Sequence, residues 1–489
     1  MAEDLIRENR LNKISRLKVF KTDAYPIYLK RTHTTEQARK NFGKLARSKK
    51  EVILVGRVMT LRAHGGATFA DIRDGTGIFQ IYVKKDALGE KSYNEFLEFF
   101  DIGDFVEARG VLFITKRGEK TLELSGIRML AKTLLPLPEK WHGLRDVEER
   151  YRKRYLDLLT NKDVRHIFET RSAIIKATRN FLEDEGFMEV ETSILQPIPG
   201  GASARPFKTH LNALDMPLYL RVAPELDLKK LLVGGFEKVF EIGRSFRNEG
   251  IDYAHNPEFT SLEFYWAYAD YKEVMKFSEK LFRDIFKTVG AYPNLTYGGK
   301  TINLKTPWPR VEFVSLFKKY LDIDYESIDR DTLSRKAEEL GIVVGKHLNK
   351  GQVADLIYKK ACRPKIEEPT FVIHHPAELA PLAKPLPDNP KYDARFQLII
   401  NGWEIVNAYS ELNDPIVQRE FFEEQEKQRK LGDEEAQRLD ETFLEAIEYG
   451  MPPATGFAFG VDRLTALLTN SHSLREVILF PTMRPKKNE

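Results

Sequence analysis

Residues 239–271, VFEIGRSFRNEGIDYAHNPEFTSLEFYWAYADY, decide the fold of this chain. Their pattern predicts two strands, 240–247 and 258–266, joined by a loop. Each strand has one apolar face, formed by Phe240, Ile242 and Phe246 and then by Leu262, Phe264 and Trp266. The opposite faces carry Glu241, Arg247, Phe259, Glu263 and Tyr265. Burying such charged side chains is costly unless a charged partner lies on them, so these faces predict a binding surface.

The loop and the strand ends carry three short runs: FRNEG at 246–250, HNPEFT at 255–260, and E-x-Y at 263–265. A plain amphipathic hairpin with an ion pair between Arg247 and Glu249 would explain any single residue, but not all three runs together. The runs resemble the second signature motif of class II aminoacyl-tRNA synthetases, and their details are similar to the lysyl-tRNA synthetases. The resemblance extends over nearly the full length of the chain.

Composition narrows the class of protein. A length of 489 residues predicts two to four domains, and 42% apolar with 31% charged residues is ordinary for a soluble protein. There is no apolar run of membrane-spanning length, and charges run through the first eighteen residues, so we expect neither a membrane span nor a signal peptide. The single cysteine, Cys362, excludes an intrachain disulfide and a thiolate zinc cluster, and it fits a reducing cytoplasm.

The first fifty residues are basic, with fourteen Lys or Arg against five Asp or Glu. We expect residues 1–50 to be a helical segment in which 36–50, EQARKNFGKLARSKK, forms one basic helix. Its positive face is either simply solvated or a contact to nucleic-acid phosphates.

The sequence pattern of residues 51–135 predicts a small β domain. Strand-like runs lie at 52–60, 68–73, 78–83, 105–114 and 121–130, with a short helix near 92–100 between the third and the fourth. This order suggests an OB-fold barrel, which stacks single-stranded bases on aromatic rings for about 1–3 kcal/mol per base. A lone phenylalanine such as Phe69 is more often a core residue than a stacking platform. The resemblance implies that Phe69 and Gln80 contact the central uridine of the anticodon, with Arg62 and Glu123 also on the anticodon side.

A linker at 136–150 precedes the larger domain, 151–489. A helix predicted at 163–185, ending at Gly186, leads into an extended run that reaches about residue 197. This unit resembles the first motif of the family, which forms the dimer interface, so a homodimer is expected; a simple core helix is the alternative. Residues 272–369 are mainly helical by pattern, and the resemblance implies a helical insertion within about 290–370. The fold class expected is α+β, with an antiparallel catalytic sheet flanked by helices.

Two further runs mark the lysyl group. HPAELAPLAK at 375–384 resembles HP-x-x-x-SPLAK, with Ala380 in place of serine, and 404–415 resembles E-x-x-NAYSELNDP. Strands at 395–400 and 403–410 are joined by Asn401 and Gly402, a strong hairpin signal. Strict alternation places Glu404 and Asn407 on opposite faces, so a shared site requires a bulge between them.

The run GFAFGVDRL at 456–464 resembles the third class II motif, GxGxGxDR, with Ala458 replacing the central glycine. It predicts a strand that enters a helix at Asp462, which we expect to be the N-cap. Leu464, Leu467 and Leu468 are expected to face the core.

The resemblance implies the activation of lysine by ATP, followed by transfer to tRNA(Lys). The lysine carboxylate is ionised at pH 7, so the site must align the reactants and stabilise phosphate charge, without a catalytic base. Arg247 and Arg463 are the implied catalytic residues, and a guanidinium such as that of Arg247 binds oxyanions bidentately. Adenine would stack between Phe259 and Arg463. The implied ATP-binding set is Arg247, Asn248, Glu249, His255, Asn256, Phe259, Gly460, Asp462 and Arg463.

Selecting lysine means burying an ammonium group, which requires carboxylates. By resemblance, Glu225 and the Gly201 carbonyl bind the α-amino group and Asn407 binds the carboxylate. The ε-ammonium would be surrounded by Glu411, Tyr265 and Glu263. The implied lysine-binding set is Gly201, Glu225, Glu263, Tyr265, Asn407, Tyr409 and Glu411.

Magnesium is expected on the phosphates, with Glu404 as one ligand. The second family position holds Gln397, and an amide brings no charge, so the affinity for metal would fall or one ion would be lost. Gln397 and Ala458 motivate an alternative to the enzyme, a catalytically impaired paralogue that binds tRNA or lysyl-adenylate. A third hypothesis, a relative that lysylates a protein, is disfavoured because such relatives lack the N-terminal barrel.

Overall fold

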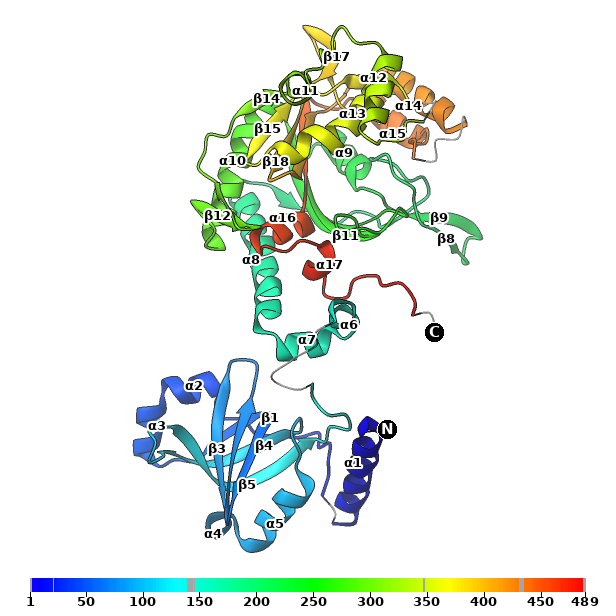
Figure 1. Ribbon diagram of the computed structural model, residues 1–489. Helices are drawn as coiled ribbons and strands as arrows, with labels where there is room; N and C mark the ends of the chain where they lie inside the picture. Colours follow the sequence, from blue (N-terminus) through cyan, green and yellow to red (C-terminus); the bar gives the residue numbers. More distant parts are fainter. Residues whose placement is uncertain are drawn as a thin grey trace. The chain divides into compact units, whose positions relative to one another are not determined.

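The computed structural model describes residues 2–20, 22–138, 144, 146–345, 348–430 and 435–486 (Figure 1). The chain divides into two units, Met1–Leu144 and Arg145–Glu489, and the division falls within the segment 136–150 expected to be a linker. In the described residues, no helix has both the length and the apolar character that a membrane span requires.

Five strands of the first unit close into a barrel in the order β1-β2-β3-β5-β4. They are β1 Val52–His64, β2 Ala67–Arg73, β3 Ile78–Lys84, β4 Phe105–Ile114 and β5 Lys120–Ala131, with α4 Lys85–Leu88 and α5 Glu90–Phe99 after β3. Alternate residues such as Ala70, Ile72 and Ile81 fill the interior, because successive side chains of a strand point to opposite faces. The predicted OB-fold barrel is confirmed.

The basic segment forms three helices: α1 Ala2–Val19, α2 Thr35–Lys40 and α3 Phe42–Ser48. The single helix predicted at 36–50 is wrong, because Asn41 (φ −94°, ψ 11°) ends α2 and starts α3. The break allows Ala38 and Phe42 to pack against the core of the barrel. A capping box between Thr34 and Gln37 fixes the start of α2.

An eight-stranded sheet organises the second unit, in the order β14-β15-β18-β19-β20-β11-β10-β6. The stretch 239–271 supplies β10 Lys238–Phe246 and β11 Glu258–Ala267, which pair antiparallel as predicted. β18 Arg395–Ile400 and β19 Trp403–Ser410 form the second predicted hairpin, and both turn residues, Asn401 and Gly402, have positive φ. β20 Ala454–Gly460 lies between β19 and β11. The remaining strands are β6 Met188–Glu189, β14 Arg310–Glu312 and β15 Thr370–Ile373.

Three helices cover one face of this sheet: α8 Lys162–Asp184, α10 Tyr271–Thr288 and α16 Val461–Leu468 (Figure 1). Their apolar side chains share one core with the sheet, in which the rings of Phe264 and Phe457 stack 4.5 Å apart. Leu464 and Leu467 are completely buried there, as predicted. This core leaves the opposite face of β19, β20 and β11 for a site.

The span 272–369 is only partly helical. After α10, strands β12 Asn294–Tyr297, β13 Lys300–Asn303 and β14 precede the remaining helices, so the insertion expected from about residue 290 begins its helical part at Phe313. The helices are α11 Phe313–Leu321, α12 Arg330–Glu339 and α13 Lys350–Ile357, followed by a π-helical turn, Tyr358–Cys362, and a 3-10 turn, Arg363–Lys365. The alternation of Leu295 and Tyr297 with polar residues in Asn294–Tyr297 is the strand signal that the sequence prediction missed.

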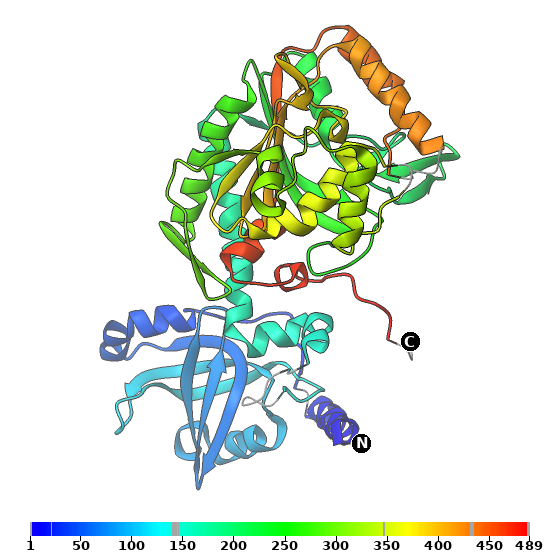
Figure 2. The same ribbon diagram turned by 45° about the horizontal axis from the view of Figure 1, so that its top comes forward.

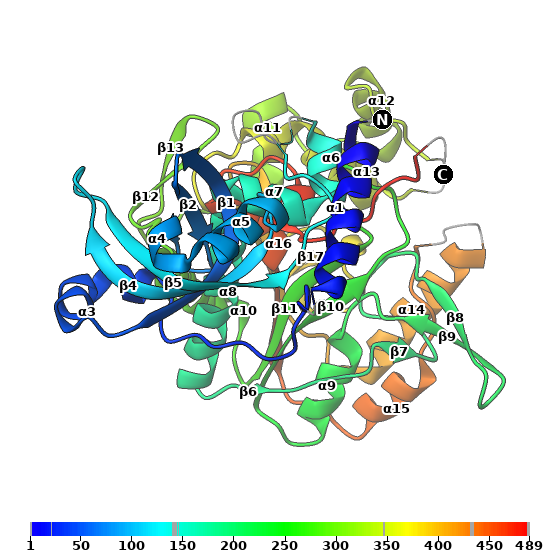
Figure 3. The same cartoon turned by 90° about the horizontal axis from the view of Figure 1, so that it is seen from below.

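Smaller elements complete the second unit, seen from two further directions in Figures 2 and 3. The helices are α6 Val147–Arg152, α7 Arg154–Thr160, α9 Glu225–Val233, α14 Pro415–Lys430, α15 Glu441–Glu448, α17 Leu474–Val477 and the 3-10 turn Ala377–Leu379. The strands are β7 Leu195–Gln196, β8 Lys208–Leu211, β9 Met216–Leu220, β16 Pro385–Leu386 and β17 Asn389–Asp393. The hairpin of β8 and β9 projects from the rest of the unit (Figure 3).

Candidate active site

The register of three neighbouring strands brings the candidate residues together. Ala458 on β20 pairs with Asn407 on β19 and with Glu263 on β11. The next row consists of Tyr409, Gly456 and Tyr265. Residues paired across strands point to the same face, so these rows form one continuous floor.

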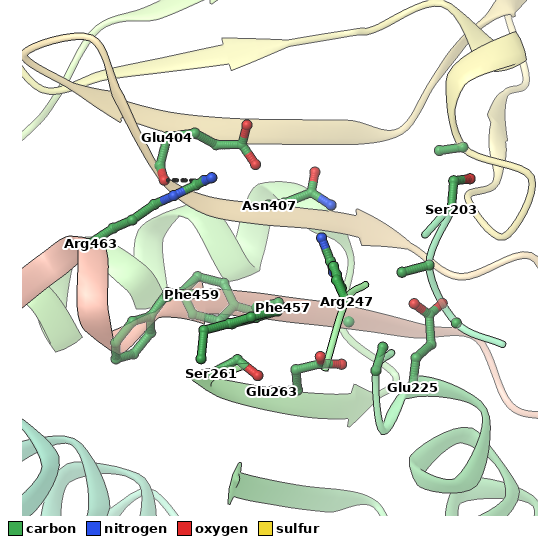
Figure 4. Close-up of a pocket in the computed structure, with 18 of the residues that line it drawn as sticks. Ser203, Glu225, Arg247, Ser261, Glu263, Glu404, Asn407, Phe457, Phe459 and Arg463 are labelled. Atoms are coloured by element: carbon green, nitrogen blue, oxygen red, sulfur yellow. Dashed lines mark hydrogen bonds between the residues drawn. The ribbon is translucent and has the colours of Figure 1, made fainter. Parts of the chain in front are cut away.

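A bulge in β19 reconciles Glu404 with Asn407. Val406 pairs with Leu398 and Glu404 pairs with Ile399, so Ile405 is an extra residue in the ladder. Glu404 and Asn407 consequently line the same cleft (Figure 4). The bulge predicted from the chemistry of the site is confirmed.

The floor belongs to a cleft of about 380 Å³. All seven residues of the implied lysine-binding set line it: Gly201, Glu225, Glu263, Tyr265, Asn407, Tyr409 and Glu411. Of the implied ATP-binding set, Asn248 is not among the lining residues, whereas the following are: Arg247, Glu249, His255, Asn256, Phe259, Gly460, Asp462 and Arg463. Gln397 lines an adjoining cavity of about 640 Å³, whose wall also includes Glu404.

Two carboxylates of the cleft share a buried lysine that sequence reasoning missed. Nζ of Lys229 lies 2.6 Å from Oε1 of Glu225 and also contacts Oε2 of Glu411. Burial lowers the pKa of Lys229, but the two carboxylates raise it more, so Lys229 remains charged. Burial raises the pKa of Glu411 to about 8, although Lys229 opposes the shift. The spacing of Glu225 and Lys229, four apart on one helix, was the available signal.

Glu263 lies on β11, at one side of the floor. Burial and the nearby Glu225 raise the pKa of Glu263 to about 8, against the opposing effect of Arg247 and Arg221. The hydroxyl of Tyr265 donates to Oε2 of Glu263 across 3.4 Å. The buried position of Glu263 therefore favours the protonated form of its carboxyl group.

Two glycines make room for the side chains of Glu411 and Glu225. A Cβ atom on Gly456 would lie 2.1 Å from Oε1 of Glu411, and one on Gly201 would lie 2.9 Å from Cβ of Glu225. Gly201 also has a φ of +87°, which a side chain would strain. The methyl group of Ala458 lies on the cleft wall between Asn407 and Glu263, at the position where the third motif has its central glycine.

Two arginines line the cleft, Arg463 beside Glu404 and Arg247 between Asn407 and Glu263 (Figure 4). The guanidinium carbon of Arg247 lies 5.1 Å from the ring centroid of Phe259, and the buried Nε of Arg247 has no partner among the described residues. Nη1 of Arg463 donates to the backbone oxygen of Glu404 across 3.2 Å. Arg247 thus keeps donor capacity for an anion.

Asp462 is not the N-cap of α16. That position belongs to Gly460, which makes no side-chain cap. Instead, Oδ2 of Asp462 accepts a hydrogen bond from the backbone N–H of Thr260 across 3.1 Å, and the carboxylate pairs with Arg171. The prediction is wrong because the carboxylate is used to join α16 to β11 and α8.

The residues expected to bind metal form a sparse donor set. In the described part of the chain, no group of three or more His, Cys, Asp or Glu could hold a metal ion. Burial raises the pKa of Glu404, but Arg463 and Arg363 lower it more, so the carboxylate is ionised. Oε1 of Gln397 accepts a hydrogen bond from the hydroxyl of Tyr358 across 3.2 Å. One carboxylate and one amide oxygen fit a magnesium ion that takes its other ligands from phosphates and water.

The four candidate anticodon residues lie on one outer face of the barrel. Arg62 pairs with Phe69, and Phe69 pairs with Tyr82. Tyr82, which the sequence prediction missed, stacks on Phe69 with 4.6 Å between ring centroids. Glu123 pairs with Tyr82 on its other side. Gln80 lies two residues before Tyr82 and therefore on the same face.

Comparison with known proteins agrees with this geometry. Residues 146–484 match the class II tRNA synthetases (D, K and N), and residues 52–130 match the OB-fold nucleic acid binding domain. The lysine–tRNA ligase of Pelotomaculum thermopropionicum is 48% identical over 99% of this chain and 96% of its own length. Those of Carboxydothermus hydrogenoformans (49%, covering 98% and 97%) and Moorella thermoacetica (47%, covering 99% of each chain) are similarly related. The chain therefore belongs to the lysine–tRNA ligase family of class II tRNA synthetases.

Proposed function

We propose that this chain activates L-lysine with ATP and transfers the lysyl group to the 3′ end of tRNA(Lys). The observation that carries the proposal is the placement of Glu225 and Glu411 in one cleft with Arg247. Two acids match the two ammonium groups of lysine, while the arginine matches its carboxylate and a phosphate.

In the first step, an oxygen of the lysine carboxylate attacks the α-phosphorus of ATP and the bond to pyrophosphate breaks. Arg247 holds the attacking carboxylate and the α-phosphate together. The two groups therefore lose their translational and rotational freedom when the substrates bind, before the reaction step. Arg463 stacks on adenine from the side opposite Phe259. In the second step, the 3′-hydroxyl of tRNA attacks the carbonyl carbon of lysyl-adenylate and AMP leaves, with the hydroxyl proton passing to solvent.

Selection of lysine follows from the charges of the cleft. A side chain that lacks the ε-ammonium leaves the oxygen of Glu411 that Lys229 does not contact without a charged partner, and the site rejects such a side chain. The Nδ2 group of Asn407 donates to the lysine carboxylate, and Gly201 offers its backbone carbonyl to the α-ammonium. Tyr265, Tyr409 and Glu263 complete the wall around the side chain.

Magnesium is expected to bind with ATP, held by Glu404 and, through its amide oxygen, by Gln397. When bound, it supplies positive charge against the phosphates. Because Gln397 contributes no charge, the arginines near Glu404 take a larger share in neutralising the triphosphate.

We assign tRNA binding to the barrel at 51–135, aided by the basic segment 1–50, and catalysis to 151–489 beyond the linker at 136–150. The row of Arg62, Phe69 and Glu123, with Gln80 beside it, supports recognition of the anticodon. We infer a homodimer because Met188, Ile194 and Leu195, in the segment that resembles the first motif, expose apolar side chains. Synthesis of lysyl-tRNA serves translation, so we infer that the enzyme works in the cytoplasm. The comparisons give no support to the impaired paralogue.

Aminoacylation of a tRNA transcript tests the proposal. The purified full-length chain, with ATP and magnesium, should attach labelled lysine to a tRNA with a UUU anticodon and much less to one whose central anticodon base is changed. A folded protein that charges neither tRNA would refute the proposed function.

A further inference from the structure

One of the chain's own lysines lies inside the candidate lysine site. Lys229 is on α9, one turn after Glu225, and is completely buried. Its Nζ contacts both Glu225 and Glu411, and the rings of Tyr409 and Phe443 lie 5.8 and 5.9 Å from it. A buried ammonium needs such carboxylates and aromatic faces, so Lys229 is fully paired without any ligand.

Each carboxylate gives only one oxygen to Lys229. Oε1 of Glu225 accepts hydrogen bonds from Nζ of Lys229 at 2.6 Å and from the hydroxyl of Tyr409 at 2.8 Å. Among the described residues, none donates a hydrogen bond to Oε2 of Glu225. Oε2 of Glu411 contacts Lys229, whereas Lys229 does not reach Oε1, and the carboxylate also accepts a hydrogen bond from the backbone amide of Gly456. One oxygen of each acid therefore remains available, and lysine brings two ammonium groups.

We propose that Lys229 is a positioning residue for the selection of lysine. It holds one oxygen of Glu225 and one of Glu411, so that the second oxygen of each can receive the α- or the ε-ammonium of the substrate. The inference rests on the proposed function, since it takes lysine as the ligand of this cleft. Lys229 acts through the two acids and not by touching the reacting atoms.

Lys229 also favours the ionised form of Glu411. Burial raises the pKa of Glu411 and Lys229 lowers it, so loss of Lys229 should raise that pKa further. Glu411 must be ionised to bind an ammonium group. Without Lys229, a larger fraction of the protein would carry protonated Glu411 and would have to lose that proton before lysine binds. The groups that face Glu411 are Lys229 and Glu225 on α9, Tyr265 on β11, Tyr409 on β19 and the amide of Gly456 on β20.

The test compares Lys229→Met with Lys230→Met in the full-length chain. Lys230 is the next residue of α9, and its partly exposed side chain pairs with Asp227 at 3.4 Å, which makes it a matched control. The readout is lysine-dependent ATP–pyrophosphate exchange from neutral to alkaline pH. Lys229→Met should raise the KM for lysine roughly 10- to 100-fold while the KM for ATP is unchanged. In a plot of kcat/KM for lysine against pH, the rise on the acidic side should shift to higher pH by about one unit. Lys230→Met should change neither.

Lys229→Arg keeps the inference testable if Lys229→Met does not fold. Arginine preserves the charge but not the position of the nitrogen atoms, so the KM for lysine should still rise several-fold, with a smaller shift of the pH limb. The inference is overturned if the unaltered chain is active and the folded variant keeps both the KM for lysine and the pH limb. An unaltered chain without lysine-dependent exchange overturns the proposed function instead.

Discussion

Nε of Arg395 donates a hydrogen bond to Oδ1 of Asn407 across 2.9 Å. Arginine has no acceptor, so the Asn407 atom that it contacts must be the oxygen. Nδ2 of Asn407 is thereby left as a donor on the wall of the cleft, which is the polarity that a carboxylate ligand requires. Sequence reasoning assigned a role to Asn407 but not to Arg395, which fixes its orientation.

Asn407→Asp should abolish this donor while strengthening the contact with Arg395. We expect the KM for lysine to rise by about two orders of magnitude, because two carboxylates would meet in a buried site, with no loss of thermal stability. Exchange kinetics and a melting curve test both parts. Asn401→Asp, in the turn before β19, is the control, and an unchanged KM for lysine in Asn407→Asp would count against the assignment.

Glu411→Gln should weaken lysine binding without affecting ATP. The neutral amide cannot pair with the ε-ammonium, so the KM for lysine should increase by about two to three orders of magnitude. Glu420→Gln, at an exposed position of α14, should behave as the unaltered chain. Equal KM values for lysine before and after the Glu411 substitution would remove this residue from the site.

Phe69→Ala should affect only the reaction with tRNA. The substitution removes the ring that stacks on Tyr82, and about 1–3 kcal/mol of base stacking should be lost, which raises the KM for tRNA. Exchange of pyrophosphate, which needs no tRNA, should continue at its normal rate. Leu97→Ala, an exposed apolar position of the same unit, is the control. A parallel fall in both activities would contradict an anticodon role.

Gln397→Glu should reduce the magnesium requirement. The change adds a charged oxygen ligand in the cavity beside Glu404, and the hydroxyl of Tyr358 can still donate to it. We expect the magnesium concentration for half-maximal exchange to fall by about three- to tenfold. Gln425→Glu places the same charge elsewhere on that cavity wall and should have little effect. If Gln397→Glu leaves the magnesium concentration for half-maximal exchange unchanged, this side chain does not face the metal.

Asp74→Asn should destabilise the barrel unit in a pH-dependent manner. Asp74 accepts hydrogen bonds from Thr35, Thr76 and Gly77, and, although burial raises its pKa, those from Thr35 and Thr76 lower it to about 2. A lowered folded-state pKa gives stability that is complete above the ordinary value of 3.8 and is lost as pH falls toward 2. We expect a loss of about 1–3 kcal/mol near neutral pH that shrinks in acid, measured by denaturant unfolding. A loss that does not vary with pH would exclude this charge effect.

The sequence predicts the features in which local pattern and chemistry agree. Alternating apolar residues located β10 and β11, and Asn401-Gly402 located the turn between β18 and β19. The bulge at Ile405 was predicted because two functional side chains had to share a face.

The remaining features depend on tertiary contacts. The sequence predicts at most a pair between Lys229 and Glu225, one turn apart on a helix, because nothing local shows that α9 also directs Lys229 at Glu411. The break at Asn41 depends on the packing of Phe42 against the barrel, and Asp462 is drawn away from capping by Arg171, which lies on a different helix.

ATP–pyrophosphate exchange with each amino acid in turn measures most directly whether the charges of the cleft select lysine. The full-length chain with magnesium should support exchange with lysine and at most a trace with ornithine, arginine or norleucine, which alter the length or the charge matched by Glu411. Comparable exchange with norleucine, or none with lysine, would contradict recognition by paired acids.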